Sequence, residues 1–417
     1  MPADLSRTTI ALADTRWVGH HPTFFKEFAA SLRRLGAFVI ALCPQPEDLA
    51  PEENLFASPL QSPNQSLLTR LDNDPAVTLM RWLATRRALD RAEDACGQIA
   101  DLVFFPYLDN YLRFLPSSGV PDLVLGRPWS GLYFRNQHLD GDSGRRCSVL
   151  KNLAKGDRLL RSPSTLPLVG VLDARFNEGL AQRSGRTALA FPDITDETPA
   201  AASDPLAEKL GALAAGRPII GLAGSLEKRK GLLTMLRTAE ASARAGDGWF
   251  FAAVGPFTPG TFSSGELAWI ERVCARLPDS LYVERRGARI PDGAPYNAVF
   301  STFAVSWAAY EEFQGSSNTL TKAALFEKPV LATRGECIGE RVEAHALGAT
   351  FPERDHGAAR RALQRILEEE RTATVRRGFA AYRQLHSRPQ LDATFERLIA
   401  SMPAERRGPG RHHAPSR

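Results

Sequence analysis

Three consecutive basic residues stand between a glycine turn and the start of a helical pattern. The stretch "GSLEKRKGLL" (224–233) follows the apolar run "RPIIGLA" and contains Lys228, Arg229 and Lys230. Because a helix N-terminus presents unpaired N–H groups and a positive partial charge, cations placed just before it disfavour the helix. A phosphate at this position would offset the charge and accept hydrogen bonds from both kinds of donor. A phosphate site and a solvated basic turn are therefore the two interpretations of this stretch.

A second set of residues with phosphate-binding chemistry lies in "EEFQGSSNTLTKAALFEKPVLAT" (311–333). Ser316, Ser317 and Asn318 follow an apolar strand pattern and precede a helical one. Small polar residues at such a turn cap the helix, and the turn also offers free N–H groups to an anion. A plain N-cap is the alternative. Two such turns in one half of the chain suit a diphosphate, although neither has the G-x-x-x-x-G-K-[ST] order of a Walker A loop.

Short apolar runs alternate with helical patterns along the whole chain, which predicts parallel sheets with crossover helices. In the first half this alternation is clearest up to residue 108. The expected elements are a strand at 8–14, a helix at 21–36, a strand at 37–43, a helix at 76–97 and a strand at 101–108. The Pro-rich stretch at 43–64 and the aromatic stretch at 128–136 are expected to be loops.

The second half repeats the pattern after a linker rich in Pro, Ala and Asp. Strands are expected at 217–224, 249–255, 280–285, 303–310 and 328–334, and helices at 231–245, 317–326 and 337–346. The predicted fold class is α/β, with two doubly wound Rossmann-like domains facing each other across a cleft. Ligands of such sheets bind beyond the carboxyl ends of the strands.

Composition limits the classes of protein to which the chain can belong. Its 417 residues fit two domains, and 43% apolar with 24% charged residues is typical of globular proteins. No apolar run reaches the length of a membrane span, no secretory signal is evident, and five scattered cysteines form no C-x-x-C pair. We expect a cytoplasmic protein. Of the net charge of +5, the last fifteen residues carry +3, so a nucleic-acid partner is not expected.

Together these motifs resemble the group 1 retaining glycosyltransferases of the GT-B fold, which use nucleotide-sugar donors without a metal. "GSLEKRKG" looks like their G-R-x-x-x-x-K-G loop, in which the lysine contacts the donor diphosphate, a role that falls on Lys230. "SSNTLTKAALFEKPVLAT" is similar to their N-x-x-x-E-A-x-A-x-G-x-P-V-I-A segment. "TRWVGHHPTFFKEFAASLRRLG" (15–36) is similar to their opening loop and helix.

The resemblance implies a division of the chain and a set of site residues. The domains are an acceptor-side domain (1–195), a linker (196–216), a donor-binding domain (217–385), a helix that crosses back to the first domain (386–402) and a disordered basic tail (403–417). The expected donor-binding residues are Gly224, Ser225, Arg229, Lys230, Ser316, Ser317, Asn318, Thr319 and Lys322. The expected catalytic residues are His20 and Glu312, and the expected acceptor-side residues are Gly19, His21 and Trp129. No metal and no cofactor is expected, because the nucleotide sugar is a substrate.

The implied activity is transfer of a sugar from a nucleotide diphosphate to a glycan or lipid-linked acceptor in envelope polysaccharide synthesis. Two departures keep a second function open: Ser225 stands where the family has arginine, and Lys322 stands where it has the glutamate that holds the ribose. The alternative is a nucleotide-sugar binding or regulatory protein without turnover. A peripheral contact with the inner membrane surface is open as well, because the helix at 76–97 carries several arginines; a solvated helix face is the simpler interpretation.

Overall fold

The computed structural model of the chain divides into two compact units. It describes residues 8–19, 21–61, 75–112, 118–136, 156–285, 287–372 and 377–403. The first unit comprises the described residues up to Pro192 together with those from Ser387 onward, and the second unit is Asp193–His386. The predicted basic tail, apart from residue 403, lies outside the described residues, as does His20.

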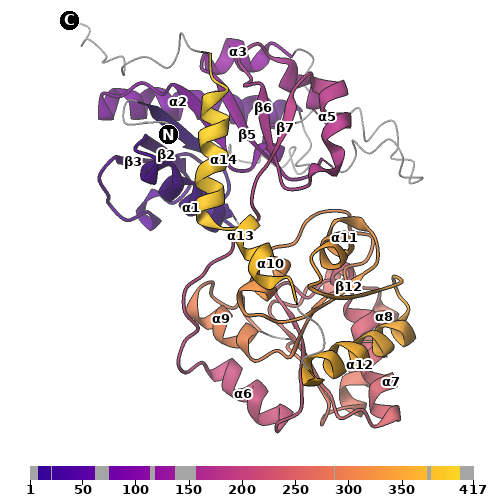
Figure 1. Cartoon of the computed structure of the whole chain (residues 1–417). Helices are drawn as coiled ribbons and strands as arrows, with labels where there is room; N and C mark the ends of the chain where they lie inside the picture. The colour runs from indigo at the N-terminus through magenta and orange to yellow at the C-terminus, as the bar shows by residue number, and fades with distance from the viewer. Residues whose placement is uncertain are drawn as a thin grey trace, which may run out of the picture. The chain divides into compact units, whose positions relative to one another are not determined.

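The first unit is built on a parallel sheet with the strand order β3-β2-β1-β4-β5-β6-β7. Its strands are β1 (Thr9–Ala13), β2 (Phe38–Cys43), β3 (Leu55–Pro59), β4 (Leu102–Phe105), β5 (Trp129–Tyr133), β6 (Leu168–Val171) and β7 (Thr187–Ala190). Its helices are α1 (His21–Arg34), α2 (Pro75–Cys96), α3 (Val120–Leu125), α5 (Asn177–Ser184) and α14 (Arg388–Ala400). Figure 1 shows these elements in indigo to magenta, with α14 in yellow.

Two stretches of the first unit that we expected to be loops contain strands. β3 lies in the Pro-rich stretch and pairs with β2, with Leu55 opposite Val39. β5 lies in the aromatic stretch and pairs with β4, with Trp129 opposite Val103. In both cases pairing with a neighbouring strand overrides the local prolines and the lack of a clear alternation.

The second unit is built on a parallel sheet with the order β10-β9-β8-β11-β12-β13. Its strands are β8 (Ile219–Ala223), β9 (Phe250–Val254), β10 (Leu281–Val283), β11 (Val305–Ala308), β12 (Val330–Thr333) and β13 (Gly348–Phe351). Its helices are α6 (Pro205–Ala214), α7 (Leu232–Ala245), α8 (Ser264–Arg276), α9 (Ala294–Ser301), α10 (Thr319–Leu325), α11 (Glu336–Ala344), α12 (His356–Thr372) and α13 (Phe379–Leu385). The predicted linker therefore contains a helix, α6, which begins at the N-cap Asp204.

Helices cover both faces of the second sheet. One core joins alternate strand residues, such as Ile220 and Phe251, to α7, α8 and α12. The other core joins their neighbours, such as Ile219 and Phe250, to α6, α9, α10, α11 and α13. Figure 1 shows α7, α8 and α12 together on one side of this sheet. The alternation of strand residues between two buried faces is that of a doubly wound sheet, so the predicted α/β class is confirmed for this unit.

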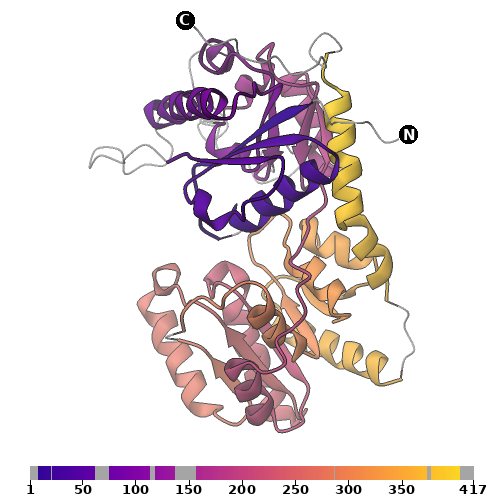
Figure 2. The ribbon, with the colours of Figure 1, turned by 90° about the vertical axis from the view of Figure 1, so that its left-hand side faces the viewer.

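In the first unit the N-terminal helix and the last helix of the chain lie side by side (Figure 1 and Figure 2). Arg388 of α14 donates to Glu27 of α1 over 2.8 and 2.9 Å, and Arg34 of α1 donates to Asp392 over 2.7 and 3.0 Å. Two bidentate pairs thus fix the register of α1 and α14, which belong to the same unit.

The second unit begins and ends at residues that are hydrogen-bonded to each other. The Asp193 amide donates to His386 Nδ1 over 2.8 Å, so the imidazole must be neutral at this nitrogen. Burial lowers the pKa of His386 to about 4; the carboxylate of Asp193 opposes this shift, and the charge of Arg341 adds to it. The junction therefore depends on an unprotonated histidine.

We predict that this junction loses stability in acid. Between a pKa of about 6.5 in the unfolded chain and about 4 in the folded one, only the unfolded state binds the proton, so the free energy of unfolding falls as the pH falls. His386→Asn keeps an acceptor near the position of Nδ1 but does not titrate. Chemical unfolding of both proteins at pH 7 and pH 4.5 should show an extra loss of about 2 kcal/mol in the native protein. Equal losses in the two proteins would contradict the role of this histidine.

Candidate functional site

The loops that follow β8 and β11 lie together at the carboxyl edge of the second sheet. The Glu311 amide donates to the carbonyl of Arg229 over 2.8 Å, which ties one loop to the other. The two strands are neighbours in the sheet although β11 follows β8 by more than eighty residues. The order of the strands reverses here, because β8 pairs with both β9 and β11, and this is the place where open α/β sheets bind ligands.

Lys230 is the basic residue of the first loop whose side chain donates a hydrogen bond to the second loop. Its Nζ donates to the phenol oxygen of Tyr310 and lies 4.0 Å from the centroid of that ring. The same phenol oxygen is 3.0 Å from Ser317 Oγ and 3.1 Å from Thr319 Oγ1. One ammonium and three hydroxyl groups therefore gather at a single point, and we call these four residues the Lys230 cluster.

The backbone explains why Lys230 points toward Tyr310. Gly231 ends the short 3-10 turn at Lys228–Lys230 with a φ of 73° and is followed by α7. A Cβ at this position would meet the carbonyl oxygen of Ala309 at 2.1 Å, so only glycine lets the two loops approach this closely. The glycine that the sequence places after the basic run thus brings Lys230 to the end of β11.

Tyr310 is 3% exposed, and two opposing effects act on its phenol. Burial raises the pKa of Tyr310, but the charge of Lys230 and the hydrogen bonds from Lys230, Ser317 and Thr319 outweigh burial and lower it overall. The phenol is therefore a stronger hydrogen-bond donor than an ordinary tyrosine. We did not single out Tyr310 from the sequence; its place at the end of the apolar run "FAVSWAAY" was the available signal.

The predicted donor residues of the 316–322 stretch point in two directions. Ser317 and Thr319 belong to the Lys230 cluster, whereas Ser316, Asn318 and Lys322 bind the segment at 193–196. Ser316 Oγ donates to Asp193 over 2.6 Å, and Asn318 accepts from Thr195 over 3.0 Å and donates to the carbonyl of Ile194. The side chains of this second group hold the chain where it enters the second unit.

Lys322 corrects our prediction of a donor-binding ammonium. It is 5% exposed, and its Nζ donates to the carbonyl of Asp196 over 2.5 Å and to Asn297 Oδ1 over 2.6 Å. Burial lowers the pKa of Lys322 to about 8, against the opposing charge of Asp196. A lysine on the buried side of α10 can reach acceptors within the protein, so its charge is not offered to a ligand.

The remaining predicted donor residues line the start of the first loop. Gly224 has a φ of 106°, which favours glycine, and the Ser225 hydroxyl is 3.4 Å from the Thr258 hydroxyl. The guanidinium of Arg229 lies 4.9 Å from the centre of the Phe313 ring. Lys228 is bonded to Glu266 over 2.6 Å. Of the three consecutive basic residues, Lys230 is therefore the one whose ammonium meets the phenol of Tyr310.

Glu312, which we expected to be catalytic, lies two residues beyond Tyr310 with a positive φ of 51°. Its side chain is 66% exposed and accepts from Arg354 over 2.5 Å. Arg354 also donates to Glu311 over 3.1 Å, and these two carboxylates raise the pKa of the guanidinium. Arg354, which the sequence analysis missed, therefore holds both carboxylates that follow β11.

Of the three predicted acceptor-side residues, His21 has a defined partner at the carboxyl edge of the first sheet. It is the first residue of α1, and its Nδ1 lies 2.7 Å from the carboxylate of Asp14, just after β1. Its ring packs on Tyr107 with 4.2 Å between centroids. Burial raises the pKa of Tyr107. Gly19 lies in the connecting loop with a φ of 66°, where glycine is favoured.

Trp129 corrects our prediction of an exposed aromatic for the acceptor. It lies in β5 with 0% exposure and packs edge-on against Trp82 at 5.1 Å and Phe105 at 6.1 Å. The side chain packs in the core, because the pairing of β5 with β4 places it there. It has no surface with which to meet a sugar.

The described ranges contain neither a metal-binding cluster nor a membrane-spanning helix. No three His, Cys, Asp or Glu side chains in these ranges come together as a metal-binding group. No helix within them combines the length and the apolar character that crossing a bilayer requires.

Comparison with known proteins places the fold. No protein-family model matches the chain, and no curated protein matches it in sequence. Among solved structures, sucrose-phosphate synthase from Thermosynechococcus elongatus is similar, with a TM-score of 0.65 and 17% identity over 94% of this chain and 98% of that one. The chain has the GT-B fold. Anabaena HepE in complex with UDP and glucose has a TM-score of 0.62 at 12% identity, over 95% of this chain and 100% of its own.

A third similar structure is the UDP-forming α,α-trehalose-phosphate synthase from Burkholderia vietnamiensis. Its TM-score is 0.62 at 13% identity, and the match covers 95% of this chain and 100% of that one. The likeness spans both units in each case, so the two-unit architecture is shared as a whole. At these identities the comparison concerns the fold, and the chemistry rests on the residues of this chain.

Proposed function

We propose that this chain is a retaining, metal-independent glycosyltransferase that moves a hexose-type residue from a nucleotide diphosphate to a glycan or lipid-linked acceptor. The observation that carries the proposal is the Lys230 cluster at the switch point of the second sheet. A lysine and three hydroxyl groups can donate hydrogen bonds to a diphosphate. Negative charge develops on the diphosphate when the sugar leaves, and these donors would stabilise it. The GT-B fold, which HepE shares in its complex with UDP-glucose, supports the same ligand class.

In the proposed reaction the bond between the anomeric carbon and the diphosphate oxygen breaks. The acceptor oxygen bonds to the same carbon on the same face, and its hydroxyl proton is released. Lys230 neutralises charge on the departing diphosphate, while Ser317 and Thr319 donate hydrogen bonds to it. His20 and His21 are proposed to meet the acceptor, and Glu312 is proposed to reach the sugar of the donor. The acceptor class, a glycan or lipid-linked sugar of an envelope polysaccharide, follows from the family resemblance.

A panel of nucleotide sugars tests this function. The expected result is slow release of nucleoside diphosphate from one donor in the absence of acceptor, because such a site activates the donor and water can replace the acceptor. Calorimetry on the same panel measures binding. A chain that neither binds nor hydrolyses any nucleotide sugar is not a glycosyltransferase.

A binding or regulatory protein without turnover is the second candidate, and Lys322 favours it. The structure holds this lysine between Asp196 and Asn297, so it leaves no carboxylate at this position for a ribose. A nucleotide sugar that binds tightly and stays intact in the panel, with acceptor present, would select this candidate over the transferase.

We predict that turnover survives chelation of divalent metals. Lysine and hydroxyl donors carry the charge of the leaving group, and the described residues hold no metal-binding group. The measurement is the rate of nucleoside diphosphate release with and without EDTA. A rate that is lost in EDTA and restored by Mg²⁺ or Mn²⁺ would overturn the metal-independent mechanism while leaving the transferase assignment in place.

A further inference from the structure

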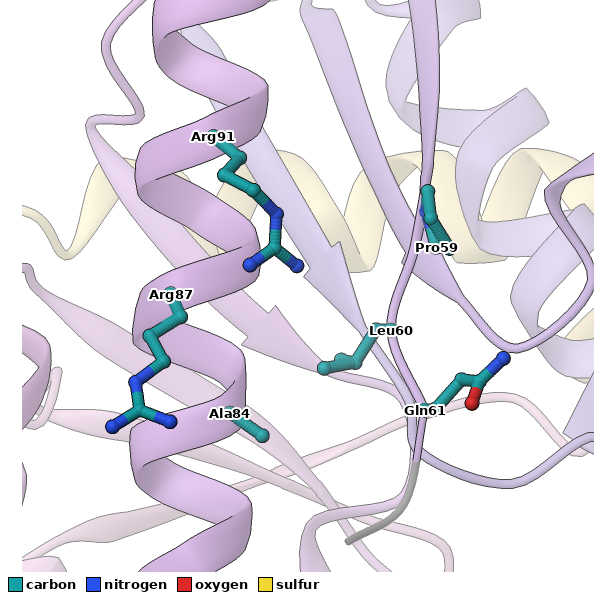
Figure 3. Close-up of a pocket in the computed structure, with 6 residues that line it drawn as sticks. All are labelled: Pro59, Leu60, Gln61, Ala84, Arg87 and Arg91. Atoms are coloured by element: carbon teal, nitrogen blue, oxygen red, sulfur yellow. The ribbon is translucent and has the colours of Figure 1, made fainter.

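A cavity of about 350 Å³ lies in the first unit, between α2 and the segment that leaves β3. Its lining residues are Pro59, Leu60, Gln61, Ala84, Arg87 and Arg91 (Figure 3). In Figure 3 Arg91 extends from α2 toward the segment, and Leu60 points from the segment toward the helix. The cavity is at the β3 edge of the sheet, whereas Asp14 and His21 follow β1, two strands away. It is therefore separate from the candidate acceptor side.

Neither arginine of the cavity has a partner among the described residues, unlike its neighbours on α2. Arg81 donates to the carbonyl of Asn110 over 3.0 Å, and Arg86 donates to Asp90 over 2.9 Å. Glu93 of the same helix is bound by Arg127 over 2.9 Å. The carboxylates of Asp90 and Glu93 are thus bound by other arginines, and Arg87 and Arg91, both exposed, line one cavity without a partner among the described residues.

This arrangement is unfavourable for the helix unless an anion joins it. Arg87 and Arg91 are spaced i and i+4, and like charges at this spacing destabilise a helix by about 0.2–0.5 kcal/mol. The attraction of cations to a helix C-terminus is confined to the last turn, and both residues lie before the last turn of α2. A phosphate between two guanidinium groups reverses the repulsion and accepts bidentate hydrogen bonds from each.

The wall of the cavity narrows the ligand class further. Leu60 is 2% exposed and faces α2 from the segment, whereas Ala84 lies on α2 beside Arg87 (Figure 3). These apolar side chains lower the local polarity, which strengthens the attraction between a guanidinium group and an anion. The volume fits a small phosphorylated molecule. Leu79, Met80 and Leu83 continue along α2, each more than a third exposed, so a lipid could also supply the phosphate.

We propose that Arg87 and Arg91 bind a phosphate monoester in this cavity, as a site distinct from the nucleotide-sugar site. Its uncharged remainder lies against Leu60 and Ala84. The same chemistry has two sources, a free phosphorylated metabolite or the headgroup of an anionic lipid. Binding here does not depend on Lys230, so this proposal stands or fails independently of the glycosyltransferase assignment.

The test uses the full chain and two probes at low ionic strength. Glycerol 3-phosphate is titrated by calorimetry, and vesicles of phosphatidylcholine with and without phosphatidic acid are used for co-sedimentation. The double variant Arg87→Gln, Arg91→Gln is expected to lose binding roughly tenfold or more. The matched control, Lys26→Gln with Arg158→Gln, removes the same charge from exposed residues of the same unit and should change binding less than about twofold. Lys230→Ala should leave this binding unchanged.

The outcomes distinguish the two possible sources of the phosphate and also show whether the proposal holds. Loss of glycerol 3-phosphate binding in the Gln variant assigns a free phosphate ligand, and a loss seen only with phosphatidic acid vesicles assigns a lipid headgroup. A Lys pair at these positions keeps the charge without the bidentate geometry, so it should bind with intermediate affinity; this variant also serves if the Gln variant does not fold. Absence of binding to either probe by the native chain, or equal loss in the Gln variant and the matched control, overturns the proposal.

Discussion

Replacing Lys230 with alanine is expected to weaken the binding of a nucleoside diphosphate by about 1.5–3 kcal/mol, which is roughly 10- to 150-fold in affinity. Lys230 is the ammonium that meets Tyr310, Ser317 and Thr319 at the carboxyl edge of the second sheet. Removing a charged donor from a partly enclosed site costs more binding free energy than breaking an exposed ion pair, because the remaining groups cannot replace the lost charge. Turnover should fall further than affinity if the lysine stabilises charge that develops in the transition state.

The same loop supplies a matched control for this variant. Lys228 stands two residues earlier and points to Glu266, with its side chain 42% exposed. Lys228→Ala removes the same charge from the same 3-10 turn, so its effect should stay within about threefold. Calorimetry with folded variants decides the question. Equal losses for both lysines would mean that net charge, rather than the position of Lys230, attracts the diphosphate.

The sequence predicted those strands and turns whose residue pattern lies within a single segment. Continuous apolar runs such as "RPIIGLA" became buried parallel strands, and the glycine after the basic run was needed for the turn at Gly231. β3 and β5 were missed because their strand character comes from pairing with β2 and β4 rather than from their own residues. A loop composition with prolines at both ends does not prevent a five-residue strand at a sheet edge.

The sequence predicted where the candidate site lies in the fold, but it did not predict which side chains bind one another there. The basic loop and the polar turn do meet at one sheet edge, as parallel topology requires. The sequence could not show that Ser317 and Thr319 face Tyr310 while Ser316, Asn318 and Lys322 face the opposite way. That division depends on the 193–196 segment, which is distant in sequence: Asn318 and Lys322 bind its backbone carbonyls, and Ser316 binds the Asp193 carboxylate.

Helix α14 buries a stripe of apolar residues whose contribution to stability a single substitution can test. Leu391, Phe395, Leu398 and Ile399 recur at helical spacing, and all four side chains are buried in the structure. Phe395 is 1% exposed and lies in a cluster of rings from the first unit. Its centroid is 5.3 Å from those of Phe28 and Phe191 and 5.2 Å from that of Phe104, with the rings edge-on in each pair.

Phe395→Ala is therefore expected to lower the free energy of unfolding of the first unit by about 3–5 kcal/mol, because it leaves a cavity and removes three edge-on ring contacts. Leu123→Ala is the control within the same unit; this side chain is 86% exposed, and its loss should cost no more than about 0.5 kcal/mol. Chemical unfolding is followed by tryptophan fluorescence, because Trp82 and Trp129 lie in the core of the first unit. A Phe395 variant as stable as the Leu123 variant would show that the contacts of α14 with Phe28 and Phe104 do not stabilise the first unit.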